Sequence, residues 1–129
     1  MTPELTVLTL AALLQVGQMC AYSVAGNMQV DVKTAFGPRD TPVHLTGVAG
    51  RLQRAMNNHF EGLLLFAIAC VLVTLTRQSS EVTETCAWVY LVARILYVPA
   101  YALGLMPWRS IIWAAGFFAT TIMLIAVLL

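Results

Sequence analysis

Two long stretches without a charged residue constrain this chain more than any other feature of its sequence. Residues 5–30 and 110–129 contain no Asp, Glu, Lys or Arg, and each is long enough to cross a hydrocarbon core about 30 Å thick. Of the 129 residues, 60% are hydrophobic and 10% charged, against roughly 45–50% and about 25% in soluble domains. The composition excludes a soluble domain, a disordered chain and a disulfide scaffold, and the net charge of +1 suggests no nucleic-acid partner. We therefore expect an integral membrane protein.

Two shorter uncharged stretches, residues 62–76 and 95–108, reach spanning length only by including polar neighbours. A membrane β-barrel would need at least about eight strands and an alternation of polar and apolar residues that this sequence lacks. The sequence predicts an all-α, integral membrane four-helix bundle that forms one domain over residues 1–129. The expected spans lie near 5–29, 52–76, 84–105 and 109–129.

The predicted connections carry typical turn and capping residues. Residues 31–50 are rich in Gly, Pro and Asp, which indicates a loop. Residues 77–81 form a short turn in which Ser80 is a candidate helix N-cap and Glu81 lies in the first turn. Gly104 to Pro107 ends the third helix.

Basic residues are unevenly divided between the two ends of the predicted bundle. The end with the first and third connections carries Lys33, Arg39, Arg51, Arg54 and Arg109. Only Arg77 lies at the other end, so the positive-inside rule predicts that the first end faces the cytoplasm. The start Met-Thr-Pro-Glu lacks a basic segment, so we expect the first helix to be a retained span and not a cleaved signal.

The cysteines and histidines give no sign of a disulfide or a metal site. Cys20, Cys70 and Cys86 lie in or beside apolar helices, and no CxxC motif occurs. Neither His44 nor His59 has a companion at the spacing of metal ligands, so no metal is expected.

Two polar stripes mark the second and third predicted helices. The first consists of Arg51, Arg54, Asn58 and Glu61, and the second of Arg94, Tyr97 and Tyr101. The members of the first stripe fall within about 80° of arc at 100° per residue. Glu61 and Arg94 each lie ~15 Å from the same end of their helices at 1.5 Å per residue, so the two can meet.

These charges have a structural and a functional interpretation. In the structural one, Glu61 and Arg94 form a buried ion pair that fixes helix packing, and Arg51 and Arg54 anchor the chain at the interface. In the functional one, the arginines outnumber the one nearby acid and form a site for an anion, ideally a carboxylate held by two hydrogen bonds. Charges inside a membrane cost at least ~2.5–3.5 kcal/mol, which favours function. The tryptophans are interpreted as interfacial anchors or packing residues: Trp88, Trp108 and Trp113.

Both stripes resemble the signatures of a known family. Residues 51–61 follow the pattern R-x-x-R-A-x-x-N-x-x-E of the MAPEG family, the membrane-associated proteins in eicosanoid and glutathione metabolism, and residues 94–101 resemble its R-x-x-[YH]-x-x-x-Y motif. The resemblance covers the whole chain in length and helix placement. It implies a subunit of a homotrimer that binds glutathione between neighbouring subunits, near the cytoplasmic face. Family members include microsomal glutathione transferases, leukotriene-C synthase and microsomal prostaglandin-E synthase.

The resemblance also implies residue roles. The positions that match glutathione contacts in the family are Arg54, Asn58, Glu61, Arg94, Tyr97 and Tyr101. Glu61 suits the ammonium group of glutathione, and the arginines suit its carboxylates. Arg109 matches the arginine that stabilises the glutathione thiolate, since a thiol of pKa ~8.5 is mostly protonated at neutral pH and a guanidinium favours the anion. Arg51 is expected to support the site.

The sequence departs from the family pattern at several positions. Gly62 stands where some relatives carry a tyrosine, and Asn57 replaces a basic residue of the prostaglandin synthase. Tyr97, in place of histidine, favours the transferase and leukotriene-synthase type. Lys33 and Asp40 belong to a loop that borders the site in relatives. The resemblance does not match these two residues to particular positions of that loop.

The sequence raises three candidate functions. The first is a membrane-bound glutathione transferase, with peroxidase activity as a second reaction, whose thiolate attacks hydrophobic electrophiles or lipid hydroperoxides that arrive from the bilayer. The second is a non-catalytic lipid-binding or scaffolding relative. The third, a small multidrug exporter, would need a glutamate in the first helix, which residues 5–30 lack. The short, compact form of the chain suggests that the protein is located in a bacterial inner membrane.

Overall fold

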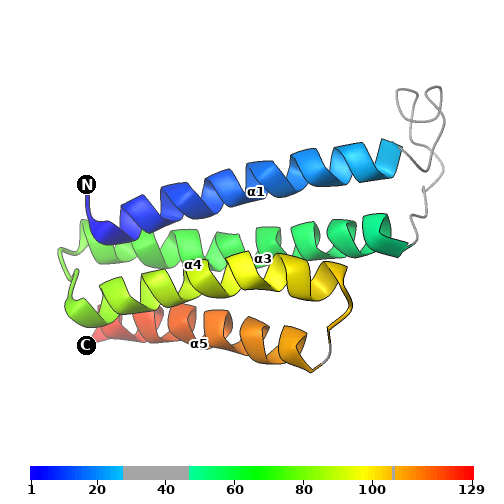
Figure 1. Ribbon diagram of the computed structural model, residues 1–129. Helices are drawn as coiled ribbons and strands as arrows, with labels where there is room; N and C mark the ends of the chain where they lie inside the picture. The colour runs from blue at the N-terminus through cyan, green and yellow to red at the C-terminus, as the bar shows by residue number, and fades with distance from the viewer. Residues whose placement is uncertain (28–46, 106) are drawn as a thin grey trace.

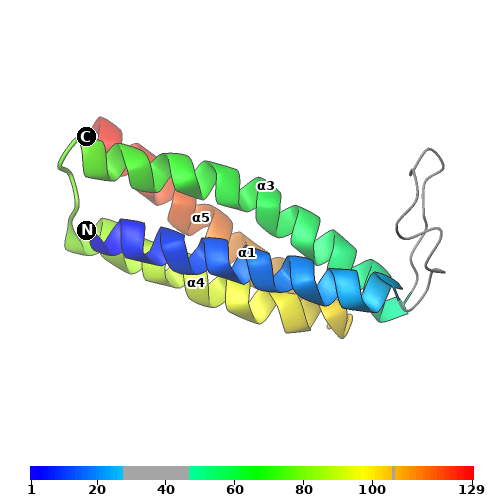
Figure 2. The ribbon, with the colours of Figure 1, turned by 90° about the horizontal axis from the view of Figure 1, so that it is seen from above.

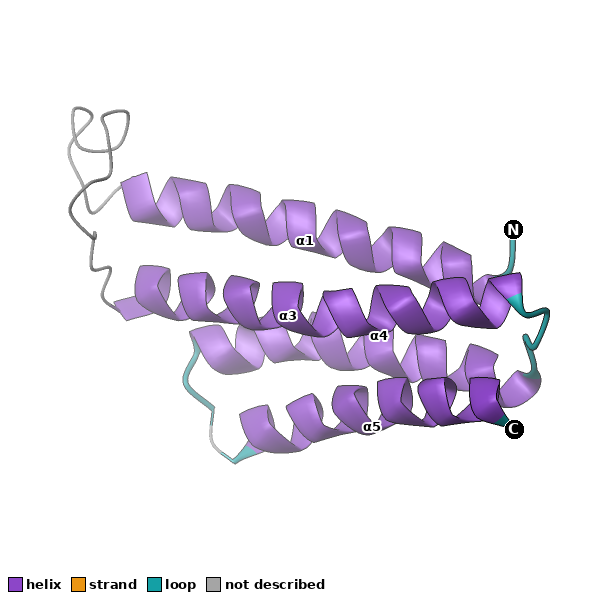
Figure 3. Ribbon diagram, turned by 180° about the vertical axis from the view of Figure 1, so that it is seen from behind, coloured by secondary structure: helices purple, strands orange, loops and turns teal. Residues whose placement is uncertain are grey.

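The computed structural model describes residues 1–27, 47–105 and 107–129, and these residues form a bundle of four helices. The helices are α1 (Pro3–Asn27), α3 (Gly47–Leu75), α4 (Glu81–Ala102) and α5 (Trp108–Leu128) (Figure 1). Each is long and apolar enough to cross a membrane, and the described residues contain no strand (Figure 3). The predicted all-α membrane architecture is therefore confirmed, and the chain is an integral, multi-pass membrane protein.

The helix bounds differ from the predicted spans mainly at two N-termini. The predicted loop at 31–50 is wrong in its last part, because α3 already begins at Gly47. Residues 28–46 lie outside the described residues, and with them Lys33, Arg39, Asp40 and His44. The next helix begins at Glu81, three residues before the predicted span, because Ser80 caps it there. A membrane span predicted from hydropathy omits such polar first turns.

The helices run up and down, so their ends gather at two opposite ends of the bundle. The two termini lie at one end with the turn between α3 and α4 (Figures 1 and 3). At the other, which we call the α4–α5 end, α4 ends and α5 begins. Views from the side and from above show that α1 and α3 cross at an angle (Figures 1 and 2). The α3, α4 and α5 helices all contact one another, which positions the site described below.

A stacked aromatic pair forms the centre of the core. The rings of Phe66 on α3 and Tyr90 on α4 lie 3.9 Å apart between centroids and are nearly parallel, at 9°. Val7 of α1 and Met123 of α5 are fully buried in the same cluster. Many large apolar side chains, such as Leu64, point outward instead, as expected where the solvent is lipid.

Two helix ends are closed by the left-handed turn known as the Schellman motif. At the end of α4, Gly104 has a φ of +68°, and the amide of Leu105 donates to the carbonyl of Ala100 over 2.8 Å. The end of α3 has the same geometry around Arg77, at a φ of 56°. Ser80 then starts α4 with a capping box, in which its side chain accepts from the amide of Thr83. The predictions for Ser80 and Gly104 are thus confirmed.

A buried glutamate ties α1 to the start of α4. The Glu4 side chain is fully buried, and its carboxylate accepts hydrogen bonds from the Ser79 hydroxyl at 2.9 Å and from the Thr83 hydroxyl at 2.6 Å. Thr83 is itself part of the capping box. One carboxylate therefore joins two helices at the terminal end of the bundle, a role that was not predicted for Glu4.

Hydrogen bonds also join α1 to α3 along their length. Nε2 of the buried His59 lies 3.1 Å from the carbonyl oxygen of Ala11. Nearer the other end of α1, the Gln53 amide donates to the Tyr22 hydroxyl over 3.3 Å. His59 thus has a packing role in the described structure.

We expect Glu4→Ala to lower the thermal stability of the detergent-solubilised protein. The substitution removes a charged acceptor and leaves the buried Thr83 hydroxyl without it, which should cost about 1.5–3 kcal/mol. Unfolding followed by circular dichroism measures the change. Glu84→Ala, at an exposed position of the same helix α4, is the matched control and should change stability by less than about 0.5 kcal/mol. Equal losses in both variants would contradict the role given to Glu4.

Candidate functional site

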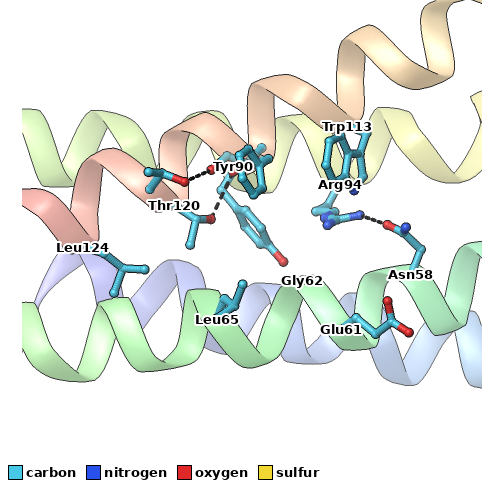
Figure 4. Close-up of a pocket in the computed structure, with 12 residues that line it drawn as sticks. Asn58, Glu61, Gly62, Leu65, Tyr90, Arg94, Trp113, Thr120 and Leu124 are labelled. Atoms are coloured by element: carbon cyan, nitrogen blue, oxygen red, sulfur yellow. Dashed lines mark hydrogen bonds between the residues drawn. The ribbon is translucent and has the colours of Figure 1, made fainter.

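The two polar stripes face each other across the contact between α3 and α4. Nη1 of Arg94 donates to the side-chain oxygen of Asn58 over 2.8 Å (Figure 4). Closer to the α4–α5 end, Nε of Arg54 donates to the Tyr101 hydroxyl over 3.2 Å. The two stripes therefore lie side by side, but neither bond joins Glu61 to Arg94, the two residues that the helical spacing predicts can meet.

Arg94 is the buried cation of the site. Its side chain is only 4% exposed, and its guanidinium carbon lies 5.4 Å from the ring centroids of both Tyr90 and Tyr97. Cation–π contacts of this kind stabilise a guanidinium that has left water. Arg94 is thereby held at a fixed position between the helices, with Asn58 as its hydrogen-bond partner.

Gly62 makes room for this guanidinium. A β-carbon built on Gly62 would collide with Nη2 of Arg94 and would lie 3.1 Å from its Cζ atom. The absence of a side chain at Gly62 is therefore a condition for the observed position of Arg94. A larger side chain at this position, such as that of tyrosine, is therefore incompatible with this arrangement of Arg94.

Glu61 does not pair with Arg94. The Glu61 side chain is exposed, and among the described residues no ion pair joins it to any arginine. The structural interpretation, a buried Glu61–Arg94 ion pair, is thus wrong for this geometry, because Arg94 turns to the neutral Asn58 instead. Within the described part of the chain, Glu61 keeps its carboxylate available for another cation.

Arg109 and Arg54 approach the same tyrosine from different helices. The guanidinium carbon of Arg109, on α5, lies 4.9 Å from the Tyr101 ring centroid, and that of Arg54 lies 5.8 Å from it. Arg51 contacts the end of α4, where its Nη1 donates to the carbonyl of Ala102 over 3.4 Å. Arg51 thus joins α3 to the end of α4.

Two adjoining cavities lie between α3, α4 and α5. The smaller, about 220 Å³, is lined by Asn58, Glu61 and Arg94 at one side and extends to Leu124 (Figure 4). The larger, about 490 Å³, is lined by Tyr97, Tyr101 and Arg109 among others. Both cavities share Asn58 and Trp113 in their walls. All the predicted site residues except Arg54 line one of them, and Arg54 contacts Tyr101.

Among the wall residues that were not predicted as site residues, Trp113, Tyr90 and Gly62 bear most directly on the geometry of the site. Trp113 was assigned to anchoring or packing, but it lines both cavities. Tyr90 lines the smaller cavity, and its position one turn before Arg94 continues the stripe at a helical spacing that could have revealed it. Gly62 gives no signal in a single sequence, because its role depends on where the Arg94 side chain lies.

We expect Gly62→Ala to destabilise the protein although alanine favours helices. The added methyl group would displace the Arg94 guanidinium and break its bond to Asn58, at a cost of about 1–3 kcal/mol. Thermal unfolding in detergent measures this loss. Gly17→Ala is the matched control, since a β-carbon on Gly17 of α1 meets nothing within 4 Å and should leave stability unchanged or raise it. A Gly62 variant as stable as the Gly17 variant would show that Arg94 does not need this space.

Comparison with known proteins agrees with the motifs of the two stripes. A family model described as the MAPEG family matches residues 5–129. A comparison with curated proteins and one with solved structures each found no match. The family model spans all four helices and both stripes, including every site residue discussed above. The chain therefore belongs to the MAPEG family.

Proposed function

We propose that this protein is a membrane-bound glutathione transferase. The observation that supports the proposal best is the charge arrangement around the two cavities. Arg94 and Arg109 line them and Arg54 lies beside them, whereas Glu61 is the only acidic residue among the described wall residues. Glutathione, with two carboxylates, one ammonium group and a thiol, has the complementary charges. Membership of a family that includes glutathione transferases agrees with this assignment.

Glutathione binding is assigned to the residues that link α3 and α4. These are Arg54, Asn58, Glu61, Arg94, Tyr97 and Tyr101. The arginines bind the two carboxylates, because a guanidinium can donate two parallel hydrogen bonds to a carboxylate. The exposed carboxylate of Glu61 binds the ammonium group. Asn58 and the tyrosine hydroxyls add hydrogen bonds that fix the orientation of the tripeptide.

Arg109 is the proposed catalytic residue. It lines the larger cavity together with Tyr97 and Tyr101, where its positive charge would stabilise the glutathione thiolate relative to the thiol. In the transferase reaction the thiolate sulfur forms a bond to an electrophilic carbon, and the leaving group departs with its electron pair. In peroxide reduction the thiolate attacks the outer oxygen of a lipid hydroperoxide. This step yields an alcohol and a sulfenic acid, which a second glutathione converts to the disulfide and water.

The exposed charges on α3 support a homotrimer. Arg54 and Glu61 are exposed in the single subunit, and Glu61 lies well inside a span that crosses the membrane. Contact of such charges with lipid costs at least ~2.5–3.5 kcal/mol for each residue on an insertion scale. A neighbouring subunit that covers this face, with glutathione between the two, would avoid that cost.

The proposed location is a bacterial inner membrane with the glutathione site facing the cytoplasm. Among the described residues, Arg51, Arg54 and Arg109 lie towards the α4–α5 end, whereas Arg77 lies in the turn at the terminal end. This asymmetry supports a cytoplasmic α4–α5 end by the positive-inside rule. Glutathione would then enter from water, and an apolar acceptor would enter from the bilayer.

We expect the purified protein in detergent to bind glutathione saturably and to conjugate it to an aryl halide such as 1-chloro-2,4-dinitrobenzene. Isothermal titration calorimetry measures the binding, and absorbance of the conjugate measures turnover. The complementary charges of the site are the physical reason for the affinity. If the wild-type protein shows no saturable binding, the transferase proposal is wrong, and the non-catalytic lipid-binding function takes its place.

We expect Arg109→Ala to lower kcat about 10²-fold, the usual effect of removing a group that stabilises developing or existing anionic charge. The glutathione Kd should change by less than about threefold. Without the guanidinium, the pKa of the bound thiol rises towards its ordinary value of about 8.5, so the loss should be larger at pH 6.5 than at pH 9. Steady-state kinetics across this pH range provide the measurement.

Arg77→Ala, which changes an arginine at the opposite end of the bundle, is the matched control for this variant. It should show wild-type kinetics. If Arg109→Ala instead weakens glutathione binding strongly and leaves kcat unchanged at saturation, Arg109 is a binding residue and another group must stabilise the thiolate.

A further inference from the structure

Three buried polar side chains, one each from α1, α3 and α4, carry atoms to which the proposed function gives no role. Gln18 is 5% exposed, His59 1% and Arg94 4%. Both polar side-chain atoms of Gln18, Nδ1 of His59 and Nε of Arg94 make no hydrogen bond to any described residue. Buried polar atoms without partners are rare in folded proteins, so their concentration in these three side chains requires an explanation.

Gln18 and His59 lean towards each other across the contact between α1 and α3. Nε2 of His59 lies opposite Ala11, and Gln18 follows two turns later on the same face of α1. Still further along α1, Tyr22 meets Gln53 of α3. Side chains point back towards the N-terminus of their helix, and α1 and α3 run in opposite directions (Figure 1). The side chain of Gln18 therefore extends towards His59, and that of His59 extends towards Gln18.

Arg94 approaches His59 from α4. Its guanidinium donates through Nη1 to Asn58, which precedes His59 in the sequence, and its positive charge acts on the His59 ring. Its Nε atom lies 3.5 Å from the position of an added β-carbon on Gly62, one turn after His59 on α3. The α4 helix contacts both α1 and α3. The three side chains thus belong to one region in the interior of the bundle.

The atoms without partners complement one another as hydrogen-bond donors and acceptors. The carbonyl of Ala11 can only accept, so Nε2 of His59 carries the hydrogen and Nδ1 of a neutral imidazole is an acceptor. Gln18 offers an acceptor oxygen and a donor amide group, whereas Nε of Arg94 can only donate. The buried Oε1 atom of Gln15, on the same face of α1, is a further acceptor. No direct hydrogen bond joins these atoms in the described structure.

Water is the ligand that fits this mixture of donors and acceptors. A water molecule both donates and accepts, and a buried water typically makes about three hydrogen bonds to polar groups that otherwise lack partners. The charge of Arg94 would repel a metal cation, and an anion would offer no hydrogen to the glutamine oxygen or to Nδ1 of His59. Arg94 also lines the smaller cavity, through which water can reach the guanidinium.

We infer that ordered water bridges Gln18 and His59 to Nε of Arg94, and that both residues thereby position the guanidinium. Asn58 holds Arg94 directly at Nη1, and the water holds it at Nε. A planar guanidinium that is fixed at two of its nitrogens cannot rotate, so its remaining hydrogens keep one direction. The effect on glutathione rests on the proposed function, in which Arg94 binds a carboxylate.

Two substitutions of His59 separate its water-facing nitrogen from the nitrogen that contacts Ala11. His59→Asn keeps a polar group near the position of Nδ1, whereas His59→Gln keeps a donor near the position of Nε2 and loses the group at Nδ1. We expect His59→Gln to raise the glutathione Kd about three- to tenfold, as the loss of one hydrogen bond would, and His59→Asn to keep it within about twofold. Isothermal titration calorimetry measures both. The reverse order, or a wild-type Kd in His59→Gln, would overturn the positioning role.

Gln18→Leu tests the water itself through the sign of a stability change. If water bridges the Gln18 amide, leucine breaks the bridge and the Tm in detergent should fall by roughly 2–6 °C. If the amide is buried in a dry interior, leucine removes an uncompensated polar group and the Tm rises. A higher or unchanged Tm would therefore overturn the inference. Thr9→Val is the matched control on α1, because Thr9 is exposed and bonds within its own helix, and it should leave the Tm within about 1 °C.

The two measurements separate this inference from the proposed function. If the wild type binds no glutathione, the proposed function fails, whereas a lower Tm of Gln18→Leu still supports the water bridge. If the wild type binds, Gln18→Leu should also raise the Kd. The double variant with His59→Gln should then raise it by less than the product of the two single increases, because both substitutions break the same bridge. An increase equal to that product would show independent effects and overturn the bridge.

Discussion

The position of the Arg94 guanidinium is the constraint on which the rest of the site depends. A cation in the middle of a membrane helix must be paired or hydrogen-bonded, because lipid tails offer no acceptor or opposite charge in compensation for its lost hydration. Here an amide oxygen from Asn58 and two tyrosine rings supply that compensation, and Gly62 supplies the space. Since the partner is neutral, Arg94 keeps its full positive charge towards the cavity, which a carboxylate partner would have cancelled.

The same helices meet two different demands on their opposite faces. Their outward faces carry many large apolar side chains that suit lipid, whereas the faces between α3, α4 and α5 carry Arg94, Arg109, Asn58 and the tyrosines. The stacked pair of Phe66 and Tyr90 sets the distance between α3 and α4. The hydrogen bonds of Glu4 fix the far end of the bundle, so the site at the α4–α5 end lies on a scaffold held at both ends.

Much of the fold and about half of the site geometry could be predicted from the sequence. The four spans follow from hydropathy, and helical spacing and equal depth predicted that Glu61 and Arg94 can meet, whereas the structure pairs Arg94 with Asn58. The pairing of Glu61 with Arg94 was a reasonable alternative by charge, but sequence spacing does not reveal which neighbour a long side chain chooses. The role of Glu4 was missed because it depends on Ser79 and Thr83, more than seventy residues away.

The sequence by itself determined the solvent, the number of helices and the family. Long uncharged stretches leave no alternative to a membrane, and two spaced motifs carry the family resemblance that the family model confirms. Only the tertiary structure decided how the charges are used. The crossing of α3, α4 and α5 leaves Arg94 buried against Gly62, Glu61 exposed, and the Tyr90 hydroxyl without a hydrogen-bond partner among the described residues. These outcomes depend on the distances between side chains of different helices, and a linear pattern of residues does not contain those distances.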